Sequence, residues 1–371
     1  MWGRFSTCPA NNSLGTGRLK TCPTNMTFAH PTIALTLGDV AGIGPEVVVR
    51  ACADPRVMAA CRPVIVGHPG VARRAIAHSS LKIEIAEVTQ PDEMPPNNTL
   101  ACWNPPAAPR AVVDVPPGQN DARAGRAAYE YLVAAAKAAI IKQVDAITTA
   151  PLSKAALHLA GLKYPGHTEI LAEVCGVRDF GMMLFLPSGG AVKSPHGLGV
   201  VHVTLHTSIR SVPDLLTTAG VAEKIELIDG FLRRIGCPSP RVAVCALNPH
   251  AGEEEIFGTE DSRIIAPAVQ TVAGRGHINV TGPLPADTLF RRAAAGEFDA
   301  VVAMYHDQGH IAFKLIGFQS AVNVTLGLPI IRTSPSHGTA FDIAWQCPAD
   351  PSGMIEAILI AAKLSRGEAA T

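Results

Sequence analysis

Three histidines stand where a divalent metal ion could be bound. His206, His250 and His306 each lie at the carboxyl end of a predicted buried strand. In open parallel α/β sheets ligands bind in the crevice beyond the carboxyl ends of the strands, so these imidazoles are expected to converge. Three neutral imidazoles hold ions such as Zn²⁺ and leave coordination positions open for a substrate. Each ring taken singly also fits a structural or capping role. The metal-site hypothesis therefore depends on the placement of all three rings at the carboxyl ends of strands.

Carboxylates accompany two of these histidines. Asp307 follows His306 directly, and Glu253 comes three residues after His250. A carboxylate that accepts the second ring N–H of a metal-binding histidine fixes the orientation and tautomer of that ring. Solvated loop residues are the alternative interpretation of both side chains.

The segment after His306 carries groups that suit an anion. Lys314, Asn323 and Arg332 supply two fixed cations and an amide, which are typical partners of phosphate or carboxylate. Ordinary surface charges are the alternative for Lys314 and Arg332. A second polar cluster, YPGHTE, places His167 and Thr168 on a loop before a predicted helix, where capping is the simpler role of Thr168.

The sequence lacks the standard nucleotide-binding fingerprints. GDVAGIGPE, with Gly38, Gly42 and Gly44, has the spacing GxxxGxG rather than GxGxxG, and no Walker A sequence occurs. This glycine turn at a helix start could cradle an anion, although tight packing explains it equally well.

Composition excludes several classes of protein. The chain has 31 Lys and Arg against 31 Asp and Glu, so it carries no net charge and is not expected to bind nucleic acid. No run of 18 apolar residues occurs, so no membrane span or membrane partner is predicted. The 9 cysteines include no CxxC pair and are interpreted as buried thiols, which predicts a cytoplasmic location.

Elements that could position these residues alternate along the chain. A strand over Thr32–Leu37 leads through the glycine turn into a helix, and the unit recurs at Arg62–Ile76. Asp121–Gln143 is the clearest helix, and 371 residues correspond to about two domains. The pattern predicts an α/β fold with parallel strands. Residues 1–30 lack an apolar signal core and are expected to form a disordered extension.

Eight motifs in fixed order resemble one enzyme family. They are GDVAGIGPE, TAPLSKAAL, YPGHTEILAE, LNPHAGE, GPLPADTLF, MYHDQGH, VNVTLGLPIIRTS and HGTAFDIA. Together they resemble the 4-hydroxythreonine-4-phosphate dehydrogenase family of pyridoxal phosphate biosynthesis and its relatives that act on threonate or erythronate 4-phosphate. The resemblance covers about Pro31 to Ser365.

The resemblance implies an architecture. It implies a homodimer whose subunits have two three-layer α/β/α lobes, similar to isocitrate and isopropylmalate dehydrogenases, with the active site in the interdomain cleft. We expect residues 31–150 plus 297–371 to form the first lobe, on the cofactor side. Residues 151–296 would form the second lobe, which carries substrate, metal and dimer contacts. Such enzymes bind NAD or NADP without a GxGxxG fingerprint.

The resemblance also implies roles for individual residues. One divalent ion (Zn, Mg, Mn, Co, Fe or Ni) would be bound by His206, His250 and His306. The implied contacts of the substrate are His167, Thr168, Lys314, Asn323 and Arg332, and those of the cofactor are His337, Gly338 and Thr339. Asp287 and Lys154 are the candidates for the catalytic proton acceptor.

The implied reaction is a metal-dependent oxidation. The secondary hydroxyl of a phosphorylated hydroxy acid, either 4-phosphohydroxythreonine or threonate or erythronate 4-phosphate, would lose a hydride to NAD(P). Loss of a carboxylate β to the new ketone would follow. The alternatives are a dihydrodiol dicarboxylate dehydrogenase of the same family, a metallohydrolase, and a non-catalytic sensor of a phosphorylated metabolite.

The chain departs from the family pattern around the implied cofactor loop. Val40 replaces the usual proline of GDPAGIGPE, and Trp345 stands where a glycine often follows FDIA. Pro335 and Ser336 precede His337, where the family commonly reads SVD. These departures leave the choice between NAD and NADP open.

Overall fold

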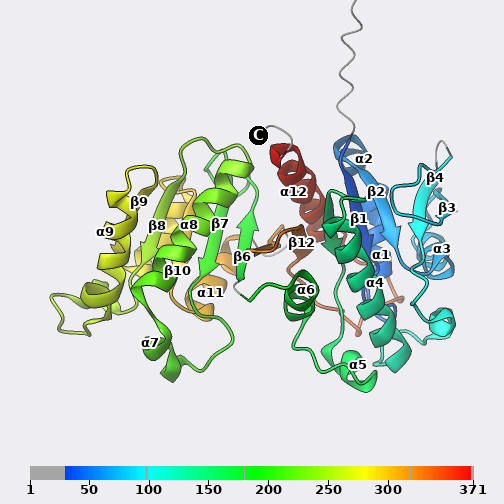
Figure 1. Ribbon diagram of the computed structural model, residues 1–371, viewed down its shortest axis with the longest axis horizontal. Coiled ribbons are helices and arrows are strands. Elements are labelled where there is room, and N and C mark those ends of the chain that lie inside the picture. Colours follow the sequence, from blue (N-terminus) through cyan, green and yellow to red (C-terminus); the bar gives the residue numbers. More distant parts are fainter. Residues whose placement is uncertain (1–29, 97–98, 179, 318–319, 369–371) are drawn as a thin grey trace, which may run out of the picture.

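The computed structural model describes residues 30–368 apart from 97–98, 179 and 318–319. The expected N-terminal extension, 1–30, lies outside the described residues except for His30. Within the described part, 12 strands form one sheet that runs through two side-by-side halves (Figure 1). None of the helices described combines the length and apolar character of a membrane span.

The sheet has the strand order β3-β4-β2-β1-β5-β12-β11-β6-β7-β10-β8-β9. Its first half contains β1 (Thr32–Thr36), β2 (Arg62–Val66), β3 (Glu84–Val88), β4 (Thr99–Trp103), β5 (Ala146–Thr149) and β12 (Ile331–Pro335). Its second half contains β6 (Gly181–Leu186), β7 (Leu198–His202), β8 (Arg241–Cys245), β9 (Asn279–Leu284), β10 (Ala300–Ala303) and β11 (Val322–Leu326).

Strand direction divides the sheet at its centre. The strands of the first half pair in parallel, as do β7, β10, β8 and β9 in the second half. Between these parallel groups, β12, β11, β6 and β7 pair antiparallel in succession. In the register of β11 with β12, Asn323 lies opposite Ser334 and Thr325 lies opposite Arg332. The two halves therefore meet at an antiparallel seam.

Helices cover both faces of each half. They are α1 (Gly44–Cys52), α2 (Pro55–Ala60), α3 (Pro69–His78), α4 (Ala122–Ile140), α5 (Lys154–Leu159), α6 (His167–Cys175), α7 (Val212–Leu215), α8 (Thr218–Arg234), α9 (Ala266–Gly274), α10 (Ala286–Ala294), α11 (His306–Gly317) and α12 (Ser352–Glu368). In the first half α4 packs on one face of the sheet and α12 on the other; in the second half α8 and α9 lie opposite α10 and α11 (Figure 1). The predicted α/β fold with parallel strands is confirmed.

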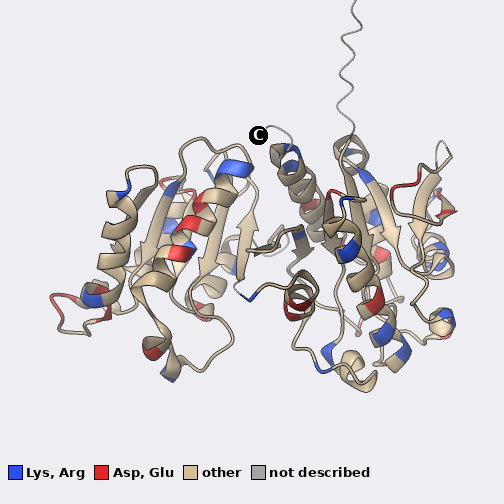
Figure 2. Cartoon of the chain, viewed as in Figure 1, with Lys and Arg blue, Asp and Glu red and all other residues tan. Residues whose placement is uncertain are grey.

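The central strands are apolar because they are buried on both faces. β7 is buried along its whole length, and β1, β2 and β8 are buried except at their first residue, which is half-buried. Such continuous apolar strands are typical of parallel sheets covered by helices on both sides. Charged residues lie mainly on the helices and loops, with both signs interspersed over the two halves (Figure 2).

The chain returns to the first half later than the sequence led us to expect. Residues 297–371 were expected in the first lobe, but β10 lies between β7 and β8, and β11 pairs with β6. The return comes at β12, which pairs in parallel with β5. The composition of β10 is that of any buried parallel strand, so only the pairing decides which half it joins.

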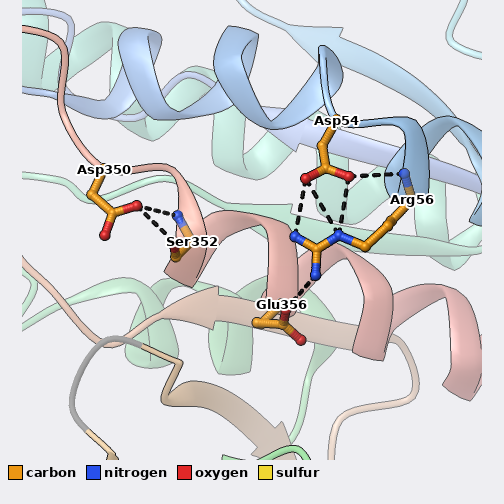
Figure 3. Close-up of polar contacts among 5 residues, drawn as sticks. All are labelled: Asp54, Arg56, Asp350, Ser352 and Glu356. Atoms are coloured by element: carbon orange, nitrogen blue, oxygen red, sulfur yellow. Dashed lines mark hydrogen bonds and ion pairs between the residues drawn. The ribbon is translucent and has the colours of Figure 1, made fainter.

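Polar contacts fasten the C-terminal helix to the first half. Arg56, in α2, binds the carboxylate of Asp54 and reaches Glu356 of α12, with 3.3 Å between Nη1 and Oε1 (Figure 3). Asp350 accepts hydrogen bonds from the backbone N–H and hydroxyl of Ser352 at the start of α12, at 2.9 and 2.6 Å. The exposed ion pairs each contribute at most about 1 kcal/mol, so their main effect is to orient α12.

Gly125 allows the close packing that positions α5, and with it Lys154. A Cβ at Gly125 would lie 2.1 Å from the carbonyl oxygen of Ala156, whereas Gly230 in α8 has no heavy atom within 4 Å of its Cβ position. We therefore expect Gly125→Ala to lower the free energy of unfolding by about 1–3 kcal/mol through overpacking. The matched Gly230→Ala variant should raise it by about 0.5–1 kcal/mol through helix propensity.

Urea denaturation of both variants checks this expectation. Equal effects of the two substitutions would show that the α4–α5 contact is not tight.

Candidate functional site

A cavity of about 260 Å³ lies between the two halves of the sheet. It is lined from the first half by residues that follow β5, by the start of α6 and by the loop after β12, and from the second half by β6, β11 and the segment after β7. The sequence-predicted residues on its wall are Lys154, His167, Thr168, His206, Asn323, Arg332, His337 and Gly338. The fold thus brings together residues that are far apart in the sequence.

Arg332 is a buried cation on this wall. Its side chain sits on β12 and the residue is only 5% exposed. Nε and Nη2 donate to the hydroxyl of Thr149 at 3.2 and 2.8 Å, and Nη1 donates to the hydroxyl of Thr325 at 3.1 Å. Burial lowers the pKa of Arg332 to about 10, which still leaves it charged at neutral pH. Both hydrogen-bond partners are neutral, and the carboxylate of Glu169 on the same wall favours the charged form of Arg332. No hydrogen bond joins the two side chains within the described residues, so the guanidinium can still bind an anion in the cavity.

Two buried polar atoms on the wall lack protein partners. Asn323 Oδ1 and His337 Nε2 are buried without a hydrogen bond from any described residue. His337 Nδ1 lies 3.1 Å from the carbonyl oxygen of Gly338 and therefore carries the proton, which leaves Nε2 as an acceptor. An unsatisfied buried polar atom costs about 1–3 kcal/mol. A bound ligand with hydrogen-bond donors would remove this cost.

The start of α6 presents backbone N–H groups and a neutral imidazole. Gly166 precedes the helix and provides no side-chain cap, so the first-turn amides remain available. His167 Nε2 lies 3.1 Å from the carbonyl oxygen of Ala150 and donates to it. Burial and the charge of Arg332 lower the pKa of His167 to about 3, so its Nδ1 is an acceptor at neutral pH. With Arg332, this helix start forms a site suited to an oxyanion.

Lys154 reaches the same cavity from the first turn of α5. Ser153 caps this helix by accepting a hydrogen bond from the backbone N–H of Ala156 at 3.1 Å. The cap sets the direction in which the helix leaves β5, and Lys154 lies on the cavity wall as a result.

His206 connects this cavity to a second one of about 410 Å³. The second cavity is lined by His206, His306 and Asp307, among others, and the ring centroids of the two histidines are 5.8 Å apart. His306 Nδ1 contacts Asp307 Oδ1 at 2.6 Å, so Nε2 is the ring atom left for a ligand. The carboxylate of Asp307 thus fixes the orientation of this ring.

The third predicted metal ligand does not join this pair. His250 is exposed in the turn Pro249–Gly252, with φ of +53°, and its ring centroid is 6.2 Å from that of Phe257. No group of three or more His, Cys, Asp or Glu within the described ranges is arranged to hold a metal ion. The donor types suit a divalent ion, but one chain assembles only two of the three rings.

Three further predicted residues also lie off the two cavity walls. Asp287 is exposed in the first turn of α10, and Lys314 is exposed in α11. Thr339 packs behind the wall, where its carbonyl oxygen accepts a hydrogen bond from the backbone N–H of Ile43 at 3.0 Å. The strands themselves end earlier than expected, at His202, Cys245 and Ala303, so the predicted ligands lie on the segments beyond them.

Two buried histidines behind His306 were not predicted from the sequence. His202, at the end of β7, is 1% exposed, and its Nε2 lies 3.2 Å from Nδ1 of His310. The ring of His310 stacks on that of His306 at 3.7 Å with an interplanar angle of 10°. Because His306 and His310 are four residues apart in one helix, the motif HDQGH could have revealed their common face.

Known proteins match most of this chain. A family model described as pyridoxal phosphate biosynthetic protein PdxA matches residues 59–361. The chain is 42% identical over 336 residues to the D-threonate 4-phosphate dehydrogenase of Pectobacterium atrosepticum, covering 90% of this chain and 99% of that protein.

Two solved structures are similar over their whole length. A 4-hydroxythreonine-4-phosphate dehydrogenase from Burkholderia phymatum superposes with a TM-score of 0.76 at 44% identity, covering 90% of this chain and 98% of that one. A terephthalate 1,2-cis-dihydrodiol dehydrogenase from Burkholderia xenovorans LB400 superposes with a TM-score of 0.63 at 32% identity, with the same shares covered, 90% and 98%.

The buried histidine pair should make folding sensitive to acid. Burial and neighbouring imidazoles lower the pKa of His202 to about 3 and that of His310 to about 4, both from 6.5. Below pH 6.5 the unfolded chain binds these protons and the folded chain does not. The free energy of unfolding should therefore fall between pH 6.5 and about 4, by about 1.4 kcal/mol per pH unit for each proton.

Urea denaturation of the metal-free protein at several pH values measures this slope. The His202→Phe variant, which removes one of the two groups, should show a shallower slope. An unchanged slope would mean that His202 is protonated in the folded protein.

Proposed function

Because this chain belongs to the family of pyridoxal phosphate biosynthetic protein PdxA, we propose that it oxidises the secondary hydroxyl of a phosphorylated hydroxy acid with NAD or NADP. The relatives named above are dehydrogenases that act on CH–OH groups. The observation that carries the proposal is the buried charge of Arg332 beside the start of α6, in the same cavity as the predicted cofactor loop.

The phosphate of the substrate would bind near Arg332. The guanidinium donates to two hydroxyls and shares the wall with the carboxylate of Glu169, and the first-turn amides of α6 supply further donors. His167 and Asn323 then contribute acceptors for substrate hydroxyls. A 4-phosphate of hydroxythreonine, threonate or erythronate has this combination of one phosphate and adjacent hydroxyls.

The oxidation separates a hydride from a proton. When bound, the nicotinamide would accept the hydrogen of the carbinol carbon with both electrons of its bond, and the hydroxyl proton would go to a protein base. Lys154 lines the cavity, whereas Asp287 is exposed on α10, so Lys154 is the better supported proton acceptor within one chain. A ketone formed β to a carboxylate then favours loss of CO₂ because the resulting enolate is stabilised.

A divalent ion would be held by His206 and His306, with His250 as the third ligand. Neutral imidazoles suit ions such as Zn, Mn, Co, Fe or Ni better than Mg. When bound, the ion would supply a Lewis acid for the substrate oxygen. The separation of 5.8 Å between the ring centroids of the first pair is compatible with two ligands of one ion.

We further propose a homodimer in which His250 of one subunit completes the histidine pair of the other. His250 and Asp287 are both exposed and lie off the cavities of their own chain. Large apolar side chains around the site are also exposed: Ile209 73%, Ile256 73%, Phe257 48%, Ile311 60% and Leu315 83%. Exposed apolar side chains in such numbers are typical of an interface between chains.

Free thiols support the cytoplasmic location that the sequence predicts. Each described cysteine is a free thiol, and five of them, Cys52, Cys61, Cys102, Cys237 and Cys245, are buried. Burial raises the pKa of these thiols, so they stay protonated at neutral pH. A protonated thiol is a poor nucleophile, which makes a catalytic role unfavourable.

A dehydrogenase assay tests the proposed activity. The purified protein, supplied with each divalent ion and with NAD or NADP, should form reduced cofactor from at least one of the three 4-phosphates. Arg332→Lys should raise KM for that substrate by about tenfold, because the lysine cannot reproduce the paired hydrogen bonds of the guanidinium. The matched Arg275→Lys variant, on the surface at the end of α9, should behave as the wild type.

Absence of reduced cofactor with all three 4-phosphates would contradict the proposal. Turnover of a dihydrodiol dicarboxylate instead would favour the alternative substrate class.

Mixing two inactive variants tests the shared metal site. If His250 acts across the dimer, His206→Ala mixed with His250→Ala regains one intact site in each mixed dimer. After subunit exchange we expect about one quarter of the wild-type activity and a matching recovery of bound metal. His206→Ala mixed with His306→Ala is the control. Both substitutions remove a histidine of the pair that one subunit supplies, so each site of the mixed dimer still lacks one ligand.

Equal recovery in both mixtures, or recovery in neither, would contradict the assignment of His250 to the partner subunit.

A further inference from the structure

Trp345 adopts a backbone conformation that bulky residues rarely tolerate. Its φ is +61°, in the left-handed region, immediately after the loop that carries His337 and Gly338. This conformation costs an L-residue roughly 1–2 kcal/mol because Cβ approaches the following carbonyl oxygen. A strained conformation persists only where surrounding contacts hold it in place. Such residues occur most often at functional sites.

Contacts from three elements hold Trp345 in place. Its backbone N–H donates to Oε1 of Glu46, in α1, at 2.7 Å. Its indole Nε1 donates to the carbonyl oxygen of Val40 at 3.0 Å. The guanidinium carbon of Arg74, in α3, lies 4.1 Å from the ring centroid, a cation–π contact. The ring of His78, also in α3, is 5.8 Å away.

Glu46 extends this anchor along the chain. The carboxylate is fully buried, and its Oε2 also accepts a hydrogen bond from the backbone N–H of Ala349 at 3.4 Å. Nε2 of His78 lies 3.5 Å from the same oxygen. One buried carboxylate therefore holds both ends of the segment 345–349.

The other end of the loop rests on the same glycine turn. The carbonyl oxygen of Thr339 accepts a hydrogen bond from the backbone N–H of Ile43 at 3.0 Å. A Cβ at Gly42 would lie 2.7 Å from that oxygen and 2.9 Å from Cβ of Thr339, so glycine is required for this approach. The loop 337–344 is thus fastened to the turn at Val40–Gly44 on both sides.

The indole contact ties the end of the loop directly to the glycine turn. Nε1 of Trp345 donates to the carbonyl oxygen of Val40, although the two residues are 305 positions apart in the sequence. Glycine would adopt the positive φ of position 345 without strain. In this chain a side-chain anchor replaces that conformational freedom.

We infer that Trp345 is a positioning residue that holds the 337–344 loop ready for the nicotinamide cofactor and strengthens cofactor binding. The inference rests on the proposed function. The loop edge suits a ligand, because Nε2 of His337 is a buried acceptor without a partner and no heavy atom lies within 4 Å of the Cβ position of Gly338. A loop that is ordered before binding loses less conformational entropy when the cofactor arrives.

Substitution of Trp345 tests the inference through cofactor affinity. Trp345→Gly removes the anchor and also relieves the backbone strain, so the variant should fold. The Kd of NADH or NADPH, followed by the emission of the reduced nicotinamide, should rise about three- to tenfold, while kcat at saturating cofactor stays within about twofold. Trp345→Phe keeps a ring beside Arg74 but lacks the indole N–H, and should give an intermediate Kd.

Two further measurements separate positioning from general destabilisation. Trp103→Phe, at the end of β4, removes a tryptophan elsewhere in the first half and should leave the Kd unchanged. Hydrogen exchange of the cofactor-free protein should show faster exchange of the 337–349 amides in Trp345→Gly, with the amides of the second half unchanged.

The outcomes distinguish the inference from the proposed function. If the wild type binds neither reduced cofactor and oxidises no 4-phosphate, the proposed function fails and the cofactor role of Trp345 fails with it. If the wild type binds cofactor but Trp345→Gly has the same Kd, or loses kcat at unchanged Kd, only the inference is overturned. A higher Kd together with faster loop exchange supports it.

Discussion

The antiparallel pairing of β11 with β12 is the constraint on which the rest of the structure depends. It joins two groups of parallel strands into one sheet and places Arg332 opposite Thr325. Because the chain crosses between the halves at this seam, residues that follow β5, β7 and β12 line one cavity. Without this pairing the candidate phosphate contact on β12 and the histidines of the second half would belong to separate surfaces.

The electrostatics of the cavity follow from its burial at the seam. Burial keeps His167 neutral and leaves Arg332 as a cation bound only to hydroxyls. The wall therefore combines the cations Arg332 and Lys154 and the carboxylate of Glu169 with neutral acceptors such as His167 and Asn323. This combination fits a substrate with one anionic group and several hydroxyls better than a polyanion. It also fits a chain with no net charge, because the attraction is local.

Much of this site could be predicted from residue types and their position in the sequence. His206 and His306 follow buried apolar runs, and the carboxyl ends of parallel strands lie at one edge of a sheet, so their proximity was predictable. The assignment of β10 to the second half was not predictable, because a buried apolar strand of four residues fits between many neighbours. His250 lies apart from His206 and His306 because of the turn after β8. The positive φ values of this turn could not be predicted from a sequence pattern.

The sequence by itself determined the fold class, the family and the types of donor at the site. These properties follow from local composition, strand and helix periodicity and short motifs, each of which a few neighbouring residues encode. Only the tertiary structure decided which of these residues meet: it placed Lys154, His167 and Arg332 on one wall and left His250 and Asp287 exposed. It also brought Trp345 onto Val40, since contacts across some 300 residues depend on how the sheet and its helices pack.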